Sequence, residues 1–181
     1  MMLMLHRSES RKDLAVRKLS LVPLAALLTA IHMSADPPTA ATVQVVKYDG
    51  LSALIKQQRG KVVVVDFWAD FCIPCKREFP KLVALNNQQA KAGLVAVSVS
   101  LDDVSVDGAK DKVLKFLQKQ QATTTNLILD EKPEVWQTKL KIDGPPLVMV
   151  FNRKGELEQK FLDKEADYAV IEKLVAELLK K

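Results

Sequence analysis

The sequence has few of the residues that most metal sites and many nucleophilic sites require. Its 181 residues include two cysteines and two histidines, and both histidines, His6 and His32, lie within the first 35 residues. The rest of the chain therefore cannot supply four cysteine and histidine ligands for a zinc ion. It also offers no histidine to activate a cysteine nucleophile. We expect no metal and no other cofactor.

An excess of one charge sign is also missing from most of the chain. The formal net charge is +5, but the first 35 residues alone hold five basic and two acidic residues. The remainder carries 22 basic and 20 acidic side chains, without a basic stripe interleaved with aromatic residues. We therefore expect no nucleic-acid partner. The length and the 48% hydrophobic content are ordinary for one globular domain.

The most apolar segment near the N-terminus is shorter than a typical membrane span. It covers residues 19–31, follows a basic region and contains Pro23. This pattern predicts a signal peptide or an N-terminal membrane anchor over residues 1–35, with an organelle transit segment as a further alternative. Residues 36–42 are predicted to form a linker and residues 43–181 the folded domain. The expected location is therefore outside the cytoplasm, in the periplasm or cell envelope.

Patterns of strands and helices alternate through the predicted domain. The expected strands are residues 42–48, 62–67, 94–100, 126–129, 147–152 and 156–162. The expected helices are residues 50–58, 73–91, 133–140 and 165–179, with a further helix capped by Asp107 and ending near Gln121. Residues 62–67 form a continuous apolar run, as in a strand buried on both faces of a sheet. The order of elements predicts an α/β fold around a central mixed sheet flanked by helices.

The two cysteines stand three residues apart, directly after an apolar strand. The motif is Cys72-Ile73-Pro74-Cys75, and a helix is expected to begin at Cys72. Free amides and the positive end of the helix dipole stabilise a thiolate at such a position. The motif therefore predicts thiol–disulfide exchange, with Cys72 as the exposed nucleophile and Cys75 as the resolving thiol. A structural disulfide, an inert pair, and metal binding across a dimer are the alternatives.

Asp66 ends the apolar strand, six residues before Cys72. Burial disfavours the charged form of a carboxyl group, so the pKa of Asp66 should be raised. A carboxylate with a raised pKa could accept the proton of Cys75. The alternative is that Asp66 points to solvent or caps a neighbouring group.

Several separated motifs together resemble those of the thioredoxin superfamily. They are Asp66-Phe67-Trp68-Ala69, Cys72-x-Pro74-Cys75-Lys76 with Pro80, and Gly144-Pro145-Pro146 before an apolar strand. The chain length between the second and third motifs is similar to that of the TlpA/ResA-like branch, whose members carry a central insertion. The resemblance implies a thioredoxin-like fold, a redox disulfide between Cys72 and Cys75, and protein-disulfide oxidoreductase activity.

The resemblance also implies a substrate-binding surface. Its members would be Trp68, Phe71, Ile73, Pro74, Pro145 and Pro146, with core filling as the alternative for either aromatic side chain. Pro146 takes the position of the family's cis-proline. Pro145 departs from the family pattern, since it has no N–H to donate to an extended substrate. The uncharged Ile73 and Pro74 do not stabilise a thiolate, which favours a reducing couple.

The expected partners are protein disulfide substrates and a membrane or soluble thiol electron donor. Cytochrome c maturation is one form of this function, but no residue selects that client over other exported proteins. A thiol peroxidase and a non-catalytic thioredoxin-like scaffold are the alternatives from other classes. The peroxidase would need a Thr-x-x-Cys setting, which the chain lacks, and scaffold modules often lose one of the two cysteines.

Overall fold

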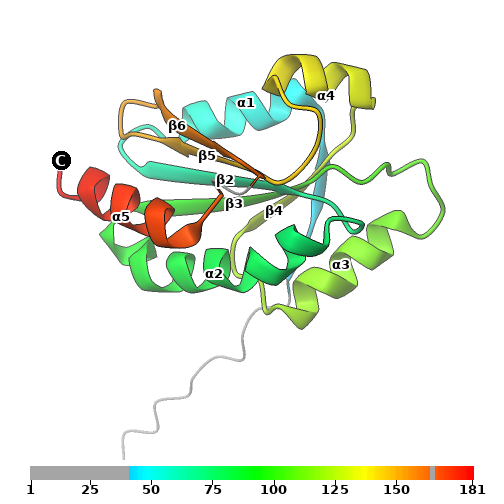
Figure 1. The fold of residues 1–181 in the computed structure, drawn as a ribbon, viewed down its shortest axis with the longest axis horizontal. Helices are drawn as coiled ribbons and strands as arrows, with labels where there is room; N and C mark the ends of the chain where they lie inside the picture. The colour runs from blue at the N-terminus through cyan, green and yellow to red at the C-terminus, as the bar shows by residue number, and fades with distance from the viewer. Residues whose placement is uncertain (1–40, 164–165) are drawn as a thin grey trace, which may run out of the picture. The chain divides into compact units, whose positions relative to one another are not determined.

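The computed structural model describes residues 41–163 and 166–181, so the predicted leader and residues 36–40 of the predicted linker lie outside the described part. In this part, helices cover both faces of a six-stranded mixed sheet (Figure 1). None of the helices in the described residues is both long enough and apolar enough to cross a membrane.

The sheet is parallel on one side and antiparallel on the other. Its strands are β1 (Gln44–Val46), β2 (Val62–Trp68), β3 (Leu94–Ser100), β4 (Thr125–Leu129), β5 (Leu147–Phe151) and β6 (Leu157–Leu162), arranged in the order β1-β4-β3-β2-β5-β6. β1, β4, β3 and β2 pair in parallel, whereas β5 and β6 add antiparallel strands. Every residue of β2 is buried, as its continuous apolar sequence predicts.

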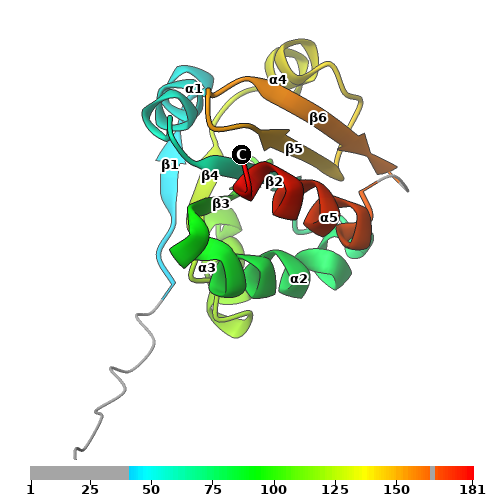
Figure 2. The same cartoon turned by 90° about the vertical axis from the view of Figure 1, so that its left-hand side faces the viewer.

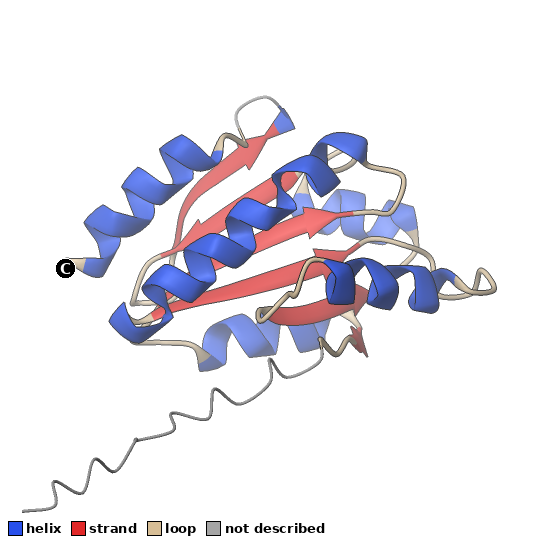
Figure 3. Ribbon diagram, turned by 90° about the horizontal axis from the view of Figure 1, so that it is seen from below, coloured by secondary structure: helices blue, strands red, loops and turns tan. Residues whose placement is uncertain are grey.

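Each face of the sheet has its own helical layer and its own core. The helices are α1 (Tyr48–Gln57), α2 (Ile73–Gln89), α3 (Ala109–Lys119), α4 (Pro133–Leu140) and α5 (Tyr168–Leu179), with the short 3₁₀ helix η1 (Ala90–Ala92) after α2. α1 and α4 cover one face (Figure 2), and α2, α3 and α5 cover the other (Figure 3). Alternate residues of β2 enter the two cores, with Val62, Val64 and Trp68 on the face of α2.

α3 and β4 lie between the cysteine motif and Gly144-Pro145-Pro146, where the central insertion is predicted. β4 lies between β1 and β3 and pairs with both in parallel. α3 lies beside α2 on the same face of the sheet (Figure 2). It brings the ring of Phe116 to 4.7 Å from the ring of Trp68, measured between centroids, so α3 contributes to the core beneath the end of β2.

Two helices begin later than the sequence predicts. The N-cap residue of α3 is Gly108, which has a φ of 71°. The side chain of Asp107 therefore does not cap this helix. α5 begins at Tyr168 because the side chain of Asp167 accepts a hydrogen bond from the backbone N–H of Ala169 at 2.9 Å. This contact is an N-cap, which fixes the start of a helix. The other elements match the predicted ranges to within two residues at each end.

Candidate redox site

Cys72 and Cys75 form a disulfide at the start of α2. Cys72 is the N-cap residue of the helix, and its Sγ accepts a hydrogen bond from the backbone N–H of Cys75 at 3.3 Å. An amide at a helix N-terminus stabilises negative charge on the sulfur that it faces. This local geometry favours Cys72 over Cys75 as the sulfur that carries a thiolate.

The prediction that Cys72 is an exposed thiol is wrong for this disulfide-bonded state. The exposed fractions of Cys72 and Cys75 are 5% and 4% in the disulfide-bonded protein. The side chains beside Cys72 do reach the surface, since Phe71 is 73% and Ile73 is 76% exposed. They present an apolar surface around a covered disulfide.

Trp68 does not lie on that surface, so its predicted place in the substrate-binding surface is wrong and the alternative of core filling holds. The alternation of β2 directs its side chain into the core on the side of α2, where it is fully buried. Its indole N–H donates a hydrogen bond to Oγ of Ser98 at 2.9 Å. Its ring centroid lies 5.5 Å from that of Phe79. Trp68 therefore packs in the core beneath the loop that precedes Cys72 and is not accessible at that surface.

Asp66 points to the same face of β2 and is 4% exposed. Its Oδ2 accepts a hydrogen bond from the hydroxyl of Tyr168 at 2.6 Å. Burial raises the pKa of Asp66 to about 6, while the hydrogen bond from Tyr168 acts in the opposite direction. The expected direction of the pKa shift is thus confirmed, and the alternative of a solvent-facing Asp66 is excluded.

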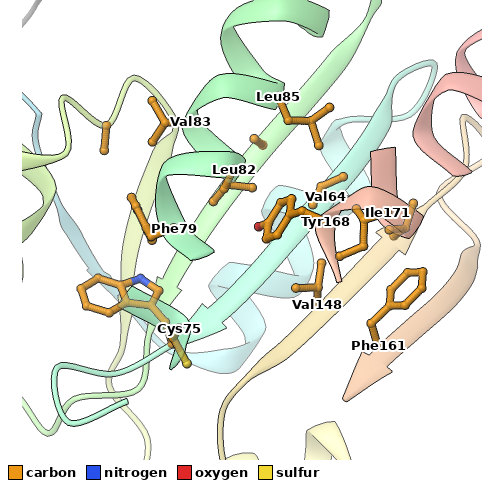
Figure 4. Packing of buried hydrophobic residues seen from close by; sticks show 14 of the residues in the cluster. Val64, Cys75, Phe79, Leu82, Val83, Leu85, Val148, Phe161, Tyr168 and Ile171 are labelled. Carbon is orange, nitrogen blue, oxygen red and sulfur yellow. The ribbon is translucent and has the colours of Figure 1, made fainter. Parts of the chain in front are cut away.

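Tyr168 is the residue of this site that sequence reasoning missed. The helix predicted over residues 165–179 is defined by its apolar face, which does not single out Tyr168. A buried tyrosine hydroxyl needs a hydrogen-bond partner, and this requirement was the available signal. Figure 4 shows Tyr168 extending from α5 into the region between Leu82 and Val148.

A pocket of about 970 Å³ joins these groups at the surface. Its lining includes Asp66, Tyr168, Cys75, Pro74, Pro146 and Val148, together with the charged side chains of Arg77, Glu78, Lys81, Asp163 and Asp167. The Pro145–Pro146 peptide bond is cis, as the resemblance implies. Pro146 therefore lies at the pocket that Cys75 also lines, and β5 continues from it beside Asp66.

The loop between β2 and Cys72 is held by polar contacts that the sequence did not reveal. The backbone N–H of Asp70 donates to both carboxylate oxygens of Asp102, at 3.1 and 2.9 Å. The ammonium group of Lys76 donates to the carboxylate of Asp70 at 2.8 Å and to its backbone oxygen at 3.0 Å. Asp70 is therefore a structural part of the loop. In the described ranges, no group of three or more potential ligands could hold a metal ion.

This chain resembles several known proteins in sequence. The model of the AhpC/TSA family matches residues 38–160. Protein DipZ of Mycobacterium tuberculosis is 30% identical over 126 residues, which are 69% of this chain and 18% of DipZ. The thiol-disulfide oxidoreductase ResA of Oceanobacillus iheyensis is 30% identical over 111 residues, which are 61% of this chain and 54% of ResA. The chain thus spans less than two thirds of the length of either relative.

A solved structure shows the same architecture. A thiol:disulfide interchange protein of the thioredoxin family from Chlorobium tepidum superposes with a TM-score of 0.55 at 22% identity, covering 71% of this chain and 84% of that protein. The likeness confirms the predicted fold class, a thioredoxin-like arrangement of helices around a central mixed sheet.

Proposed function

The chain belongs to the AhpC/TSA family of thioredoxin-like proteins, and we propose that it is a protein-disulfide oxidoreductase with Cys72 and Cys75 as its redox centre. The observation that carries this proposal is the disulfide at the N-terminus of α2, with the amide of Cys75 directed at the sulfur of Cys72. The name of the relative ResA supports the same activity. Peroxide reduction is less well supported, because neither cysteine has a threonine three residues before it.

The reaction would proceed through a mixed disulfide. The thiolate of Cys72 attacks a client disulfide, a bond forms between Cys72 and one client sulfur, and the other client sulfur leaves and takes a proton from water. Cys75 then transfers its thiol proton to the carboxylate of Asp66, and its sulfur attacks Sγ of Cys72. The bond from Cys72 to the client breaks, and the second client sulfur leaves as a thiolate. Two electrons have passed to the client, and an external dithiol must return them to the Cys72–Cys75 disulfide.

Reduction of insulin by dithiothreitol tests the proposed activity. The purified protein is expected to accelerate the reduction, whereas the double variant Cys72→Ser/Cys75→Ser should react no faster than dithiothreitol alone. If the unaltered protein is no faster than the double variant, the activity is excluded, and the alternative of a non-catalytic thioredoxin-like scaffold is favoured.

Asp66→Asn is expected to slow the resolution of the mixed disulfide. The amide cannot accept the proton of Cys75, and loss of a general base typically reduces a rate by about 10²- to 10⁴-fold. The first attack by Cys72, followed with a chromogenic aryl disulfide, should change little, because the amide of Cys75 that faces Cys72 is retained. Unchanged turnover with insulin would remove Asp66 from the mechanism.

We propose that the couple acts as a reductant. Ile73 and Pro74 bring no charge to the loop, and the ammonium group of the nearby Lys76 is paired with Asp70 at 2.8 Å. A thiolate that gains no further stabilisation from charged side chains of its loop makes the disulfide a weaker oxidant. The midpoint potential, measured in thiol/disulfide buffers, is expected to be more negative than about −150 mV, whereas a higher value would overturn the reductive role.

We also propose a location in the periplasm or cell envelope. The support is the basic region followed by an apolar run within residues 1–35. The clients would then be disulfides of exported proteins, cytochrome c precursors among them, and the electron donor would be a thiol protein of the membrane. Fractionation of cells that express the full chain with a C-terminal tag tests this location. Recovery in the cytosolic fraction alone would contradict it.

A further inference from the structure

The C-terminal helix places a tyrosine hydroxyl on the carboxyl group at the centre of the site. The hydroxyl of Tyr168 donates to Oδ2 of Asp66 at 2.6 Å, across 102 residues of sequence. Both residues are buried, with exposed fractions of 1% and 4%. A short hydrogen bond in such surroundings is stronger than one in water, because little solvent competes for either partner.

We infer that Tyr168 is a positioning residue for the thiol exchange: its hydroxyl holds one oxygen of Asp66 and sets how readily the carboxyl group takes a proton. The inference rests on the proposed function. The second oxygen, Oδ1, accepts no hydrogen bond from the described residues, and Asp66 and Cys75 line the same pocket. The hydrogen bond from Tyr168 therefore occupies Oδ2 of Asp66 and leaves Oδ1 to accept the proton of Cys75.

Tyr168 acts in this pair only as a donor. Burial raises the pKa of its hydroxyl well above the usual value, and the neighbouring carboxyl of Asp66 acts in the same direction. Glu78 on α2 and Glu172 on α5 add smaller contributions of the same sign. The hydroxyl thus stays protonated at physiological pH, so it stabilises the charged form of Asp66 and does not itself remove a proton from Cys75.

Burial and this hydrogen bond set the affinity of Asp66 for a proton. Burial raises the pKa of the carboxyl and Tyr168 lowers it, with a result of about 6. The other charged side chains at the pocket are Arg77, Glu78 and Lys81 on α2, and Asp163 and Asp167 before α5. Glu78 is paired with Lys81 and Arg77, which reduces its effect on Asp66. Among the described residues, Tyr168 is therefore the side chain whose hydrogen bond lowers the pKa of Asp66 against the rise caused by burial.

Tyr168→Phe tests the inference, because it removes the hydroxyl and keeps the ring. Loss of a hydrogen bond to a charged group is expected to raise the pKa of Asp66 by about one unit. Carbon-13 NMR of the aspartate carboxyl groups in the oxidised protein measures this pKa directly. The pH profile for resolution of the mixed disulfide should move to higher pH by the same amount.

Tyr48→Phe is the matched control, since Tyr48 is the chain's other tyrosine and belongs to α1, which covers the opposite face of the sheet (Figure 2). It should leave both the Asp66 titration and the pH profile unchanged. In the background of Asp66→Asn, Tyr168→Phe should no longer shift the profile, since no carboxyl group remains for the hydroxyl to act on.

The results separate this inference from the proposed function. An unchanged Asp66 titration in Tyr168→Phe, in a protein that reduces insulin, would overturn the role of Tyr168 and leave the oxidoreductase activity standing. If the unaltered protein fails to reduce insulin, the proposed function is contradicted. The role of Tyr168 in that reaction is then contradicted as well, even if the Asp66 titration shifts in Tyr168→Phe. A profile shift that persists in the Asp66→Asn background would show that Tyr168 acts through another group.

Discussion

Cys72→Ser is expected to reduce insulin turnover to the rate of dithiothreitol alone, whereas Cys75→Ser should complete one attack and stop at a mixed disulfide. The two thiols are the chain's only cysteines, so no other sulfur can replace either one. Their burial is nearly equal, so exposure does not assign their roles. The assignment depends on the amide of Cys75, which faces the sulfur of Cys72 and stabilises its thiolate.

Non-reducing electrophoresis with a disulfide-bonded client distinguishes the two variants. Cys75→Ser should give a band in which client and protein are joined, and Cys72→Ser should not. Val106→Ser is a suitable control, because it introduces a serine at an exposed position in the loop before α3 and should keep full turnover. The account would be contradicted if Cys72→Ser formed the joined species and Cys75→Ser did not, since Cys75 would then be the nucleophile.

Asp66→Asn is expected to stabilise the oxidised protein at pH 7 by about 3 kcal/mol. Burial raises the pKa of Asp66 from 3.8 to about 6, a shift of about two units. Each unit corresponds to about 1.4 kcal/mol of preference for the protonated form in the folded state. Asparagine removes the cost of burying the charge and can still accept the hydrogen bond from Tyr168. The same substitution should thus raise stability and reduce activity.

The pH dependence of stability follows from the direction of this shift. Between about pH 4 and pH 6, folded Asp66 binds more protons than unfolded Asp66, so the free energy of unfolding falls as the pH rises. The destabilisation by Asp66 is absent below pH 4 and complete above pH 6. The advantage of Asp66→Asn should accordingly be large at pH 7 and disappear near pH 4.

Urea unfolding at both pH values, followed by circular dichroism, measures this difference. Asp143→Asn provides the matched control, since Asp143 is an exposed aspartate and its replacement should change stability by less than about 0.5 kcal/mol. An Asp66→Asn variant that is less stable than the unaltered protein at pH 7 would show that the carboxylate is not destabilised by burial.

Most of the fold could be predicted because its signals are local. The continuous apolar run of β2 indicates burial on both faces, and the strand ends where the cysteine motif begins. The turn at Gly155, with a φ of 79°, joins β5 to β6 as the hairpin signal predicts. The cis peptide bond before Pro146 cannot be predicted from a local pattern, and only the resemblance to the family implies it.

The two errors at the site concern contacts between residues far apart in the sequence. Trp68 lies in the core because Ser98 on β3 and Phe116 on α3 surround it, and neither neighbour can be identified from the residues beside it. Tyr168 contacts Asp66 because α5 lies across β2, which depends on the packing of the whole layer. An amphipathic pattern shows which face of a helix is buried, but not which residue it meets.

The central claim is that Cys72 and Cys75 open and close their bond reversibly, and mass spectrometry of the intact protein tests it most directly. The protein is equilibrated with mild reductant or mild oxidant, and its free thiols are then blocked by alkylation. The account predicts two alkylated cysteines after reduction, none after oxidation, and a difference of two hydrogen atoms between the unblocked forms. Identical alkylation and mass under both conditions would contradict the account.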